Sequence, residues 1–212
     1  MDNVWFVSGT DTDVGKTVAT GWLAAQWIRN GHKTITQKFI QTGSQGGSPD
    51  IHQHRKIMQK QFLEDEEGLT APEVFSYPSS PHMASRIDGR KIDFEKILNA
   101  AEILSARYER LLVEGAGGLM VPLTTTLLTI DFVAQQNWPV IFVTSGKLGS
   151  INHTLLSLEA LKTRGMILSH VIFNDWHPLP DKKIDEDTFA FLAKWLHREW
   201  PTTELLRCPK LS

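Results

Sequence analysis

The residues with the clearest chemical potential lie near the N-terminus, in residues 9–17 (GTDTDVGKT). Small residues let the backbone curl so that its N–H groups face an anion, and Gly-Lys-Thr is typical of a loop that binds nucleotide phosphates. In such a loop Lys16 would reach the β- and γ-phosphates, and the Thr17 hydroxyl would coordinate Mg²⁺. The usual pattern is Gly, four residues and Gly-Lys-Ser/Thr, but here Thr10 holds the first glycine position and Gly9 lies one residue early.

The segments around this loop support a phosphate-binding role, because strand and helix patterns flank it. Residues 4–8 form an apolar run that predicts a buried strand, and residues 16–29 carry apolar residues at helical spacing. Residues 34–40 are rich in β-branched residues and predict a second strand. Together these segments predict a βαβ unit with the loop at its first turn.

The rest of the chain continues the alternation of strands and helices. Helices are expected at 50–61, 93–110, 129–137, 150–164 and 185–200, and strands at 111–113, 140–144 and 171–173. An acidic, solvated turn is expected at 64–68, an extended proline-containing loop at 72–82 and another loop at 177–180. This order predicts one α/β domain over residues 1–212, a doubly wound and mostly parallel sheet of the P-loop NTPase type with helices on both faces.

Polar residues and glycines follow each expected strand, where open parallel sheets bind their ligands. After the first strand and its loop they are Lys38 and Thr42, Glu114 with its glycines, Lys147, and Asn174 with Asp175. A carboxylate at the end of a strand beside a phosphate loop commonly serves Mg²⁺, which points to Glu114. Asp50 offers a second oxygen ligand, although its place after Ser-Pro also suits a helix N-cap. We therefore predict a metal site at Thr17, Asp50 and Glu114.

Composition and charge exclude several classes of function. A net charge of −2 gives no bulk attraction to nucleic acid or an anionic membrane, and no apolar run approaches the roughly 18 residues that span a bilayer. The single Cys208 excludes an internal disulfide framework and a cysteine-based zinc site. His52 and His54 fall on different helix faces and are expected to be surface residues or neighbours of a site rather than metal ligands. No basic segment precedes the first strand, so a cytoplasmic protein is expected.

Several motifs, taken in chain order, resemble those of the dethiobiotin synthetases. They are residues 9–17, Lys38 with Thr42-Gly43, Ser80-Pro81-His82, residues 114–118 (EGAGG), residues 147–153 (KLGSINH) and Asn174-Asp175. The resemblance runs from about residue 3 to residue 176 and implies a ligase of biotin biosynthesis. In that reaction 7,8-diaminononanoate takes up CO₂ (or bicarbonate) as a carbamate, ATP converts it to a carbamic-phosphoric anhydride, and the second amine closes the ring.

The resemblance also implies roles for individual residues. Lys38 falls at the position of the catalytic lysine, and Lys16, Thr12 and Asp13 at other catalytic positions. The positions implied for ATP are Asp13, Val14, Gly15, Lys16, Thr17, Val18, Asp50, Glu114, Gly115, Ala116, Gly117, Asn174 and Asp175, with Mg²⁺ as the cofactor. The positions implied for the substrate are Thr42, Gly118, Ser150, Ile151 and Asn152. In the family the helix start at Ser150–Asn152 belongs to a partner subunit, which implies a homodimer.

Some positions depart from the family pattern and leave alternatives open. Asp13 replaces a common Glu, Thr42 a common Ser, and Phe39 a common Pro. The region after Cys208 is shorter than the region that the family uses around the base and ribose, so the nucleotide preference stays open. One alternative is a partitioning-type switch ATPase, but such proteins carry a lysine where Asp11 stands. Others are a related ligase acting on a different amine or carboxylate, and a nucleotide-binding protein without turnover.

Overall fold

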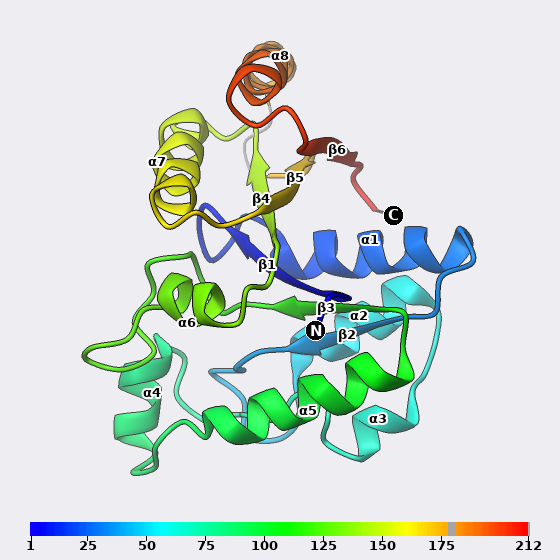
Figure 1. The fold of residues 1–212 in the computed structure, drawn as a ribbon, viewed down its shortest axis with the longest axis vertical. Coiled ribbons are helices and arrows are strands. Elements are labelled where there is room, and N and C mark those ends of the chain that lie inside the picture. The colour runs from blue at the N-terminus through cyan, green and yellow to red at the C-terminus, as the bar shows by residue number, and fades with distance from the viewer. Residues whose placement is uncertain (178–180, 212) are drawn as a thin grey trace.

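A parallel β-sheet organises the chain, and the computed structural model describes residues 1–177 and 181–211. Within these residues six strands form one sheet in the order β2-β3-β1-β4-β5-β6 (Figure 1), and every neighbouring pair is parallel. The strands are β1 (Val4–Gly9), β2 (Thr34–Lys38), β3 (Arg110–Glu114), β4 (Val140–Ser145), β5 (Leu168–Asn174) and β6 (Glu204–Cys208).

Helices cover both faces of the sheet. They are α1 (Lys16–Arg29), α2 (Pro49–Met58), α3 (Leu63–Glu66), α4 (Pro81–Ile87), α5 (Phe94–Arg107), α6 (Thr129–Gln135), α7 (Ser150–Thr163) and α8 (Lys182–Glu199). Buried side chains of α1 and α2 pack on one face of the sheet. Those of α5, α6, α7 and α8 pack on the other, as the two sides of Figure 1 show. The predicted doubly wound α/β fold is confirmed.

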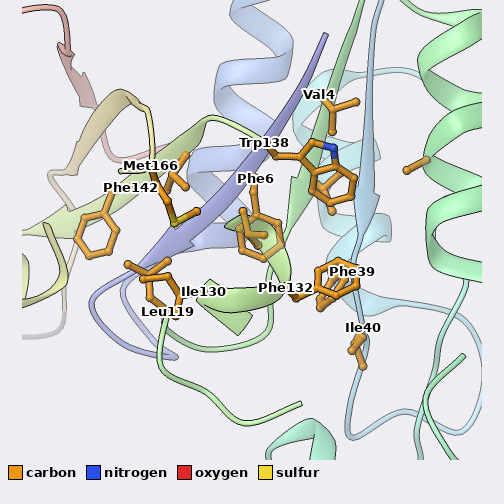
Figure 2. Close-up of a cluster of buried hydrophobic side chains, with 14 of the residues drawn as sticks. Val4, Phe6, Phe39, Ile40, Leu119, Ile130, Phe132, Trp138, Phe142 and Met166 are labelled. Carbon is orange, nitrogen blue, oxygen red and sulfur yellow. The ribbon is translucent and has the colours of Figure 1, made fainter. Parts of the chain in front are cut away.

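The core divides at the sheet because side chains alternate along each strand. Phe6 on β1 and Val113 on β3 belong to the cluster under α5 and α6, whereas Val7 on β1 faces α1. An aromatic group forms the centre of the larger cluster (Figure 2), with ring centroids 5.6 Å apart for Phe6 and Phe39 and 5.1 Å apart for Phe39 and Phe132. This rigid core holds the C-terminal ends of β1, β2 and β3 in place.

The register of the central strands brings two site residues together. Across β2 and β3, Lys38 is paired with Glu114, and across β3 and β1, Glu114 is paired with Val7. The phosphate loop leaves β1 two residues after Val7. Three strands therefore deliver a lysine, a carboxylate and the phosphate loop to one edge of the sheet.

The structure corrects several predicted elements. The sixth strand, β6, was not predicted, and it pairs with β5 through residues 204–208. A short helix, α3, replaces the predicted turn at 64–68, and α4 begins at Pro81 inside the predicted loop, since proline suits the first turn of a helix. Helix α5 ends at Arg107, not at 110, because Tyr108 is already extended.

The predicted strand at 171–173 is longer and starts at Leu168, and the predicted helix at 185–200 starts at Lys182. Most of the predicted loop at 177–180 lies outside the described residues. Among the described helices, none has the length and apolar character needed to cross a membrane.

Candidate active site

The phosphate loop connects β1 to α1 through two glycines with different tasks. Gly15 has a φ of 89°, a left-handed conformation that favours glycine, and it directly precedes α1. No side chain of the described residues caps α1, so the N–H groups of its first turn are available for an anion. A Cβ on Gly9 would lie 2.7 Å from Val14 Cγ1 and 2.9 Å from the Val143 carbonyl oxygen. The early glycine is thus required by close contacts, and Thr10 is tolerated after it.

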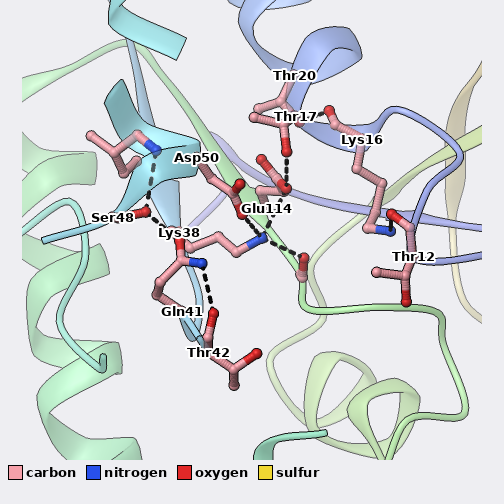
Figure 3. A network of polar contacts seen from close by, with 12 residues as sticks. Thr12, Lys16, Thr17, Thr20, Lys38, Gln41, Thr42, Ser48, Asp50 and Glu114 are labelled. Carbon is pink, nitrogen blue, oxygen red and sulfur yellow. Dashed lines mark hydrogen bonds and ion pairs between the residues drawn. The ribbon is translucent and has the colours of Figure 1, made fainter. Parts of the chain in front are cut away.

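Lys16, the lysine of the loop, is folded back over the loop backbone (Figure 3). Its ammonium donates hydrogen bonds to the carbonyl oxygens of Asp11 at 2.6 Å and Thr12 at 3.3 Å. Burial lowers the pKa of Lys16 from 10.5 to about 8, against the opposing attraction of Glu114. Lys16 is therefore charged at neutral pH, and its ammonium lies where it can stabilise the negative charge of a bound phosphate.

Lys38 lies between two carboxylates at the centre of the site (Figure 3). Its Nζ is 2.5 Å from Asp50 Oδ2 and 2.8 Å from Glu114 Oε1, and it also donates to the Gly115 carbonyl oxygen at 3.1 Å. The Thr17 hydroxyl donates to the same Glu114 oxygen at 2.9 Å. Residues from β2, α2, β3 and α1 therefore meet at one charged centre.

The charges at this centre stabilise one another. Burial alone would raise the pKa of Glu114, but Lys38 and His54 outweigh it and hold the pKa far below its usual value. Burial would lower the pKa of Lys38, but Glu114 and Asp50 outweigh it and raise the pKa. Glu114 is therefore an anion and Lys38 a cation near neutral pH.

The oxygen atoms of this centre suit a hard divalent cation. Thr17, Asp50 and Glu114 all present oxygens, and the Lys38 ammonium already occupies a cationic position between the two carboxylates. Magnesium prefers one or two carboxylates completed by phosphate oxygens and water. Within the described residues there is no group of three or more His, Cys, Asp or Glu side chains that could hold a metal ion by itself. This donor set fits Mg²⁺ bound together with a nucleotide.

A cavity of about 590 Å³ opens in front of this centre. The predicted site residues in its wall are Thr12, Asp13, Lys16, Thr17, Lys38, Thr42, Asp50, Glu114, Ala116 and Gly117. The structure therefore brings most of the predicted catalytic and nucleotide residues together with Thr42. The wall also includes the segment 78–81. Ser80 and Pro81 of this segment belong to a motif that resembles the family's, but they were not predicted as site residues.

The helix start at α7 lies apart from the cavity that holds Lys38. Ser150 lines a second cavity of about 200 Å³, which it shares with Asp13 and Val14 of the phosphate loop, and Ile151 lines a shallower one beyond it. Asn152 is exposed, and Leu148 just before the helix is 84% exposed. Within one chain, the predicted substrate residues of α7 do not join Thr42.

Other predicted residues support the phosphate loop. Buried Asn174 donates from its side-chain amide to the Val14 carbonyl oxygen at 2.9 Å, and a Cβ on Gly15 would lie only 2.3 Å from Asn174 Nδ2. Asp175 forms an ion pair with Arg207 of β6 at 2.8 Å. The predicted roles of Asn174 and Asp175 in binding ATP stay predictions.

The remaining predicted positions, Val18, Gly115 and Gly118, pack beside the site and do not line its cavity. Val18 packs its side chain against the core under α1. A Cβ on Gly115 would lie 2.7 Å from the Phe6 ring, and one on Gly118 would lie 3.2 Å from the Gly9 carbonyl oxygen. The glycines after β3 therefore let two loops lie close together beside the cavity.

The sequence allowed His54 as a neighbour of a site but did not connect it with Glu114. His54 is fully buried, and its Nε2 lies 2.6 Å from Glu114 Oε2. The available signal was its spacing, since His54 follows Asp50 by four residues and so shares its helix face. His52, by contrast, is exposed.

The sheet order, the loop after β1 and the charged centre define a P-loop nucleotide-binding protein. A family model described as an AAA domain matches residues 3–199. A ParA family ATPase from Chlorobium tepidum shares the fold, with a TM-score of 0.55 and 12% identity over 100% of this chain and 86% of that one. Chloroplast FtsY from Physcomitrella patens has a TM-score of 0.52 and 12% identity, covering 96% and 57%.

Curated relatives specify the family further. The chain is 46% identical to ATP-dependent dethiobiotin synthetase BioD 2 of Pasteurella multocida, over 96% of this chain and 95% of that protein. It is 44% identical to BioD 2 of Haemophilus ducreyi, covering 97% and 98%, and 44% identical to BioD of Chlorobaculum tepidum, covering 91% and 80%. The chain belongs to the dethiobiotin synthetase family.

Proposed function

We propose that this protein is an ATP-dependent dethiobiotin synthetase, a ligase that uses CO₂ to close a ureido ring on 7,8-diaminononanoate. The observation that carries the proposal is the position of Lys38, between Glu114 and Asp50 and in the same cavity as Lys16, Thr17 and Thr42. The names of relatives that are 44% to 46% identical over most of their length support it.

The proposed reaction has three chemical steps. One amine adds to CO₂ to give a carbamate, and a carbamate oxygen then attacks the γ-phosphorus while the bond to ADP breaks. The second amine attacks the carbonyl carbon of the resulting carbamic-phosphoric anhydride, and inorganic phosphate leaves as the ring closes. Negative charge thus accumulates first on the carbamate and then on the transferring phosphoryl group.

The cations of the site match this charge. Lys38 and Lys16 are buried and project into the cavity from different elements, so they would stabilise the transition state without a large rearrangement. Thr17, Asp50 and Glu114 would hold Mg²⁺, which when bound neutralises phosphate charge. Because phosphoryl transfer needs little covalent help from the protein, this preorganisation is the main contribution of the chain.

The substrate would lie against Thr42, whose hydroxyl can bind one end of the diamine. The N–H groups that begin α7 would bind a carboxylate, but within one chain they lie outside this cavity. We therefore include a homodimer in the proposal, in which the α7 start of one subunit completes the cavity of the other. Exposed Leu148 (84%), just before α7, and exposed Leu156 (63%), within α7, support a protein-covered surface.

The test is a turnover assay with product analysis. Purified protein should hydrolyse ATP only when Mg²⁺, bicarbonate and 7,8-diaminononanoate are all present. Mass spectrometry should detect a product heavier than the diamine by one CO₂ minus one water. ATP hydrolysis that is independent of the diamine, without this product, would contradict the proposal.

The dimer has its own test. Leu148→Glu should convert a dimer into a monomer in analytical ultracentrifugation, and turnover should fall with the dimer fraction. Phe191→Glu is the matched control, because Phe191 is also exposed (40%) but lies on α8. A monomeric wild-type protein with full turnover would rule out the shared site.

A further inference from the structure

The two oxygens of the Glu114 carboxylate have different partners. Oε1 accepts hydrogen bonds from Thr17 and Lys38 and faces the cation site, whereas Oε2 accepts one from His54 at 2.6 Å. Because Glu114 is almost fully buried, solvent does not compete for either oxygen. The contact with His54 therefore fixes which oxygen the carboxylate presents to the site.

His54 reaches Glu114 because of its position on α2. Asp50 and His54 are four residues apart, so both side chains leave the same face of the helix. Asp50 contacts Lys38 from this face, and His54 contacts Glu114. A single helix turn thus holds both carboxylates of the predicted metal site, one directly and the other through a histidine.

Both ring nitrogens of His54 have a hydrogen-bond partner. Arg55 NH1 donates to Thr36 Oγ1 at 2.7 Å, and Thr36 Oγ1 lies 3.0 Å from His54 Nδ1. Since Thr36 accepts from arginine, its own proton is free to be donated to Nδ1. Because the ionised Glu114 carboxylate can only accept, Nε2 of His54 carries a proton and donates it to Glu114.

Arg55, at the start of this series of hydrogen bonds, is held in place by its own contacts. Arg55 donates to both carboxylate oxygens of Asp65 at 2.8 Å and to the Thr36 carbonyl oxygen at 3.1 Å. The guanidinium is stacked 4.6 Å from the centroid of the Phe62 ring. A continuous run of hydrogen bonds therefore connects Arg55 through Thr36 and His54 to Glu114.

We propose that His54 is a positioning residue of the reaction, which holds the Glu114 carboxylate with Oε1 directed at the Mg²⁺-nucleotide site. This inference rests on the proposed function, because it takes Glu114 as a magnesium carboxylate. A free carboxylate would rotate and lose part of its affinity for the cation. Partners of this kind behind a metal ligand commonly change metal affinity or activity by about 10- to 100-fold.

The test compares nucleotide binding with and without Mg²⁺ by titration calorimetry. His54→Leu should reduce the Mg²⁺-dependent gain in ADP affinity by about 10- to 100-fold, while affinity for metal-free ADP stays near the wild-type value. His54→Gln places an amide donor near the Nε2 position and should recover most of the gain. His52→Leu is the matched control, since this exposed residue lies on the same helix and should change neither affinity.

A second pair of variants covers the case in which His54→Leu does not fold. Thr36→Val removes the hydroxyl that lies 3.0 Å from His54 Nδ1 and helps to orient the ring, so it should reduce the Mg²⁺-dependent gain, whereas Thr36→Ser should retain it. The proposal is overturned if His54→Leu and Thr36→Val keep the wild-type gain, or if His54→Gln loses it as completely as His54→Leu. These readouts are independent of turnover, so a wild-type protein that binds Mg²⁺-nucleotide but makes no dethiobiotin would refute the proposed function alone.

Discussion

Replacing Lys38 by methionine tests the charged centre most directly. The change keeps most of the side-chain volume but removes the ammonium that lies 2.5 Å from Asp50 and 2.8 Å from Glu114. Removing one partner of a buried ion pair typically costs about 3–5 kcal/mol. Glu114 keeps its bonds to Thr17 and His54, and Asp50 is 26% exposed in its side chain, so we expect the lower end, about 3 kcal/mol.

The effect on turnover should be larger than the effect on binding. Loss of one preorganised donor at a developing charge costs roughly 10²–10³ in kcat. Nucleotide affinity should change far less, because Lys16 and the α1 N-terminus remain in place. The vacated position between two carboxylates should bind Mg²⁺ in the absence of nucleotide, so Mg²⁺ should raise the Tm of the variant more than that of the wild type.

The assays are urea unfolding, Mg²⁺-dependent thermal melting and single-turnover kinetics. Lys162→Met is the matched control, because it removes an exposed ion pair with Glu199 on the other side of the sheet and should leave turnover unchanged. Near-normal turnover of Lys38→Met, or equal Mg²⁺ stabilisation of variant and wild type, would refute the reasoning.

Three further outcomes follow from burial and charge. Because Lys16 has a pKa of about 8, it loses its proton above that pH, and ADP affinity should fall there by up to about tenfold per pH unit. Calorimetry of Lys16→Ala should show no such dependence, and a variant with the wild-type pH dependence of ADP affinity would contradict the prediction. Phe39→Ala should lower the unfolding free energy by about 3–5 kcal/mol in urea titration, since Phe39 is fully buried among aromatic rings, whereas exposed Phe191→Ala should have little effect. Burial raises the pKa of the Cys208 thiol to about 12, so a thiol reagent at pH 8 should modify Cys208 only in denaturant. Rapid reaction with the native protein would argue against the buried position of Cys208 at the end of β6.

The parts of the site that lie at strand ends could be predicted from sequence. Lys38 and Glu114 follow apolar runs, and the rule that ligands bind beyond the carboxyl ends of parallel strands was enough to bring them together. Strand β6 escaped prediction because it is a short edge strand in which Cys208 is the only fully buried residue, so its sequence lacks a strong pattern. Helix α4 escaped because Pro81 reads as a loop residue unless its place in the first turn is known.

The hydrogen bonds around His54 could not be predicted for a different reason. Its partners Thr36 and Glu114 lie 18 residues before it and 60 residues after it, and the sequence does not specify their register. Helical spacing places Asp50 and His54 on one face of α2, but it does not show what that face contacts. Predicting long-range contacts of this kind requires the order of the strands in the sheet, and the alternation of strands and helices along the sequence does not specify that order.

The wide spacing of the Glu114 partners also has a consequence for how the protein acquires its activity during folding. Thr17, Lys38 and His54 are separated from Glu114 by 97, 76 and 60 residues, so each contact closes a long loop of chain. Such loops cost entropy that only the pairing of β1, β2 and β3 can offset. The charged centre around Glu114 therefore assembles after the sheet, and in refolding experiments the proposed Mg²⁺-dependent nucleotide binding should emerge in the same slow phase as the parallel strands.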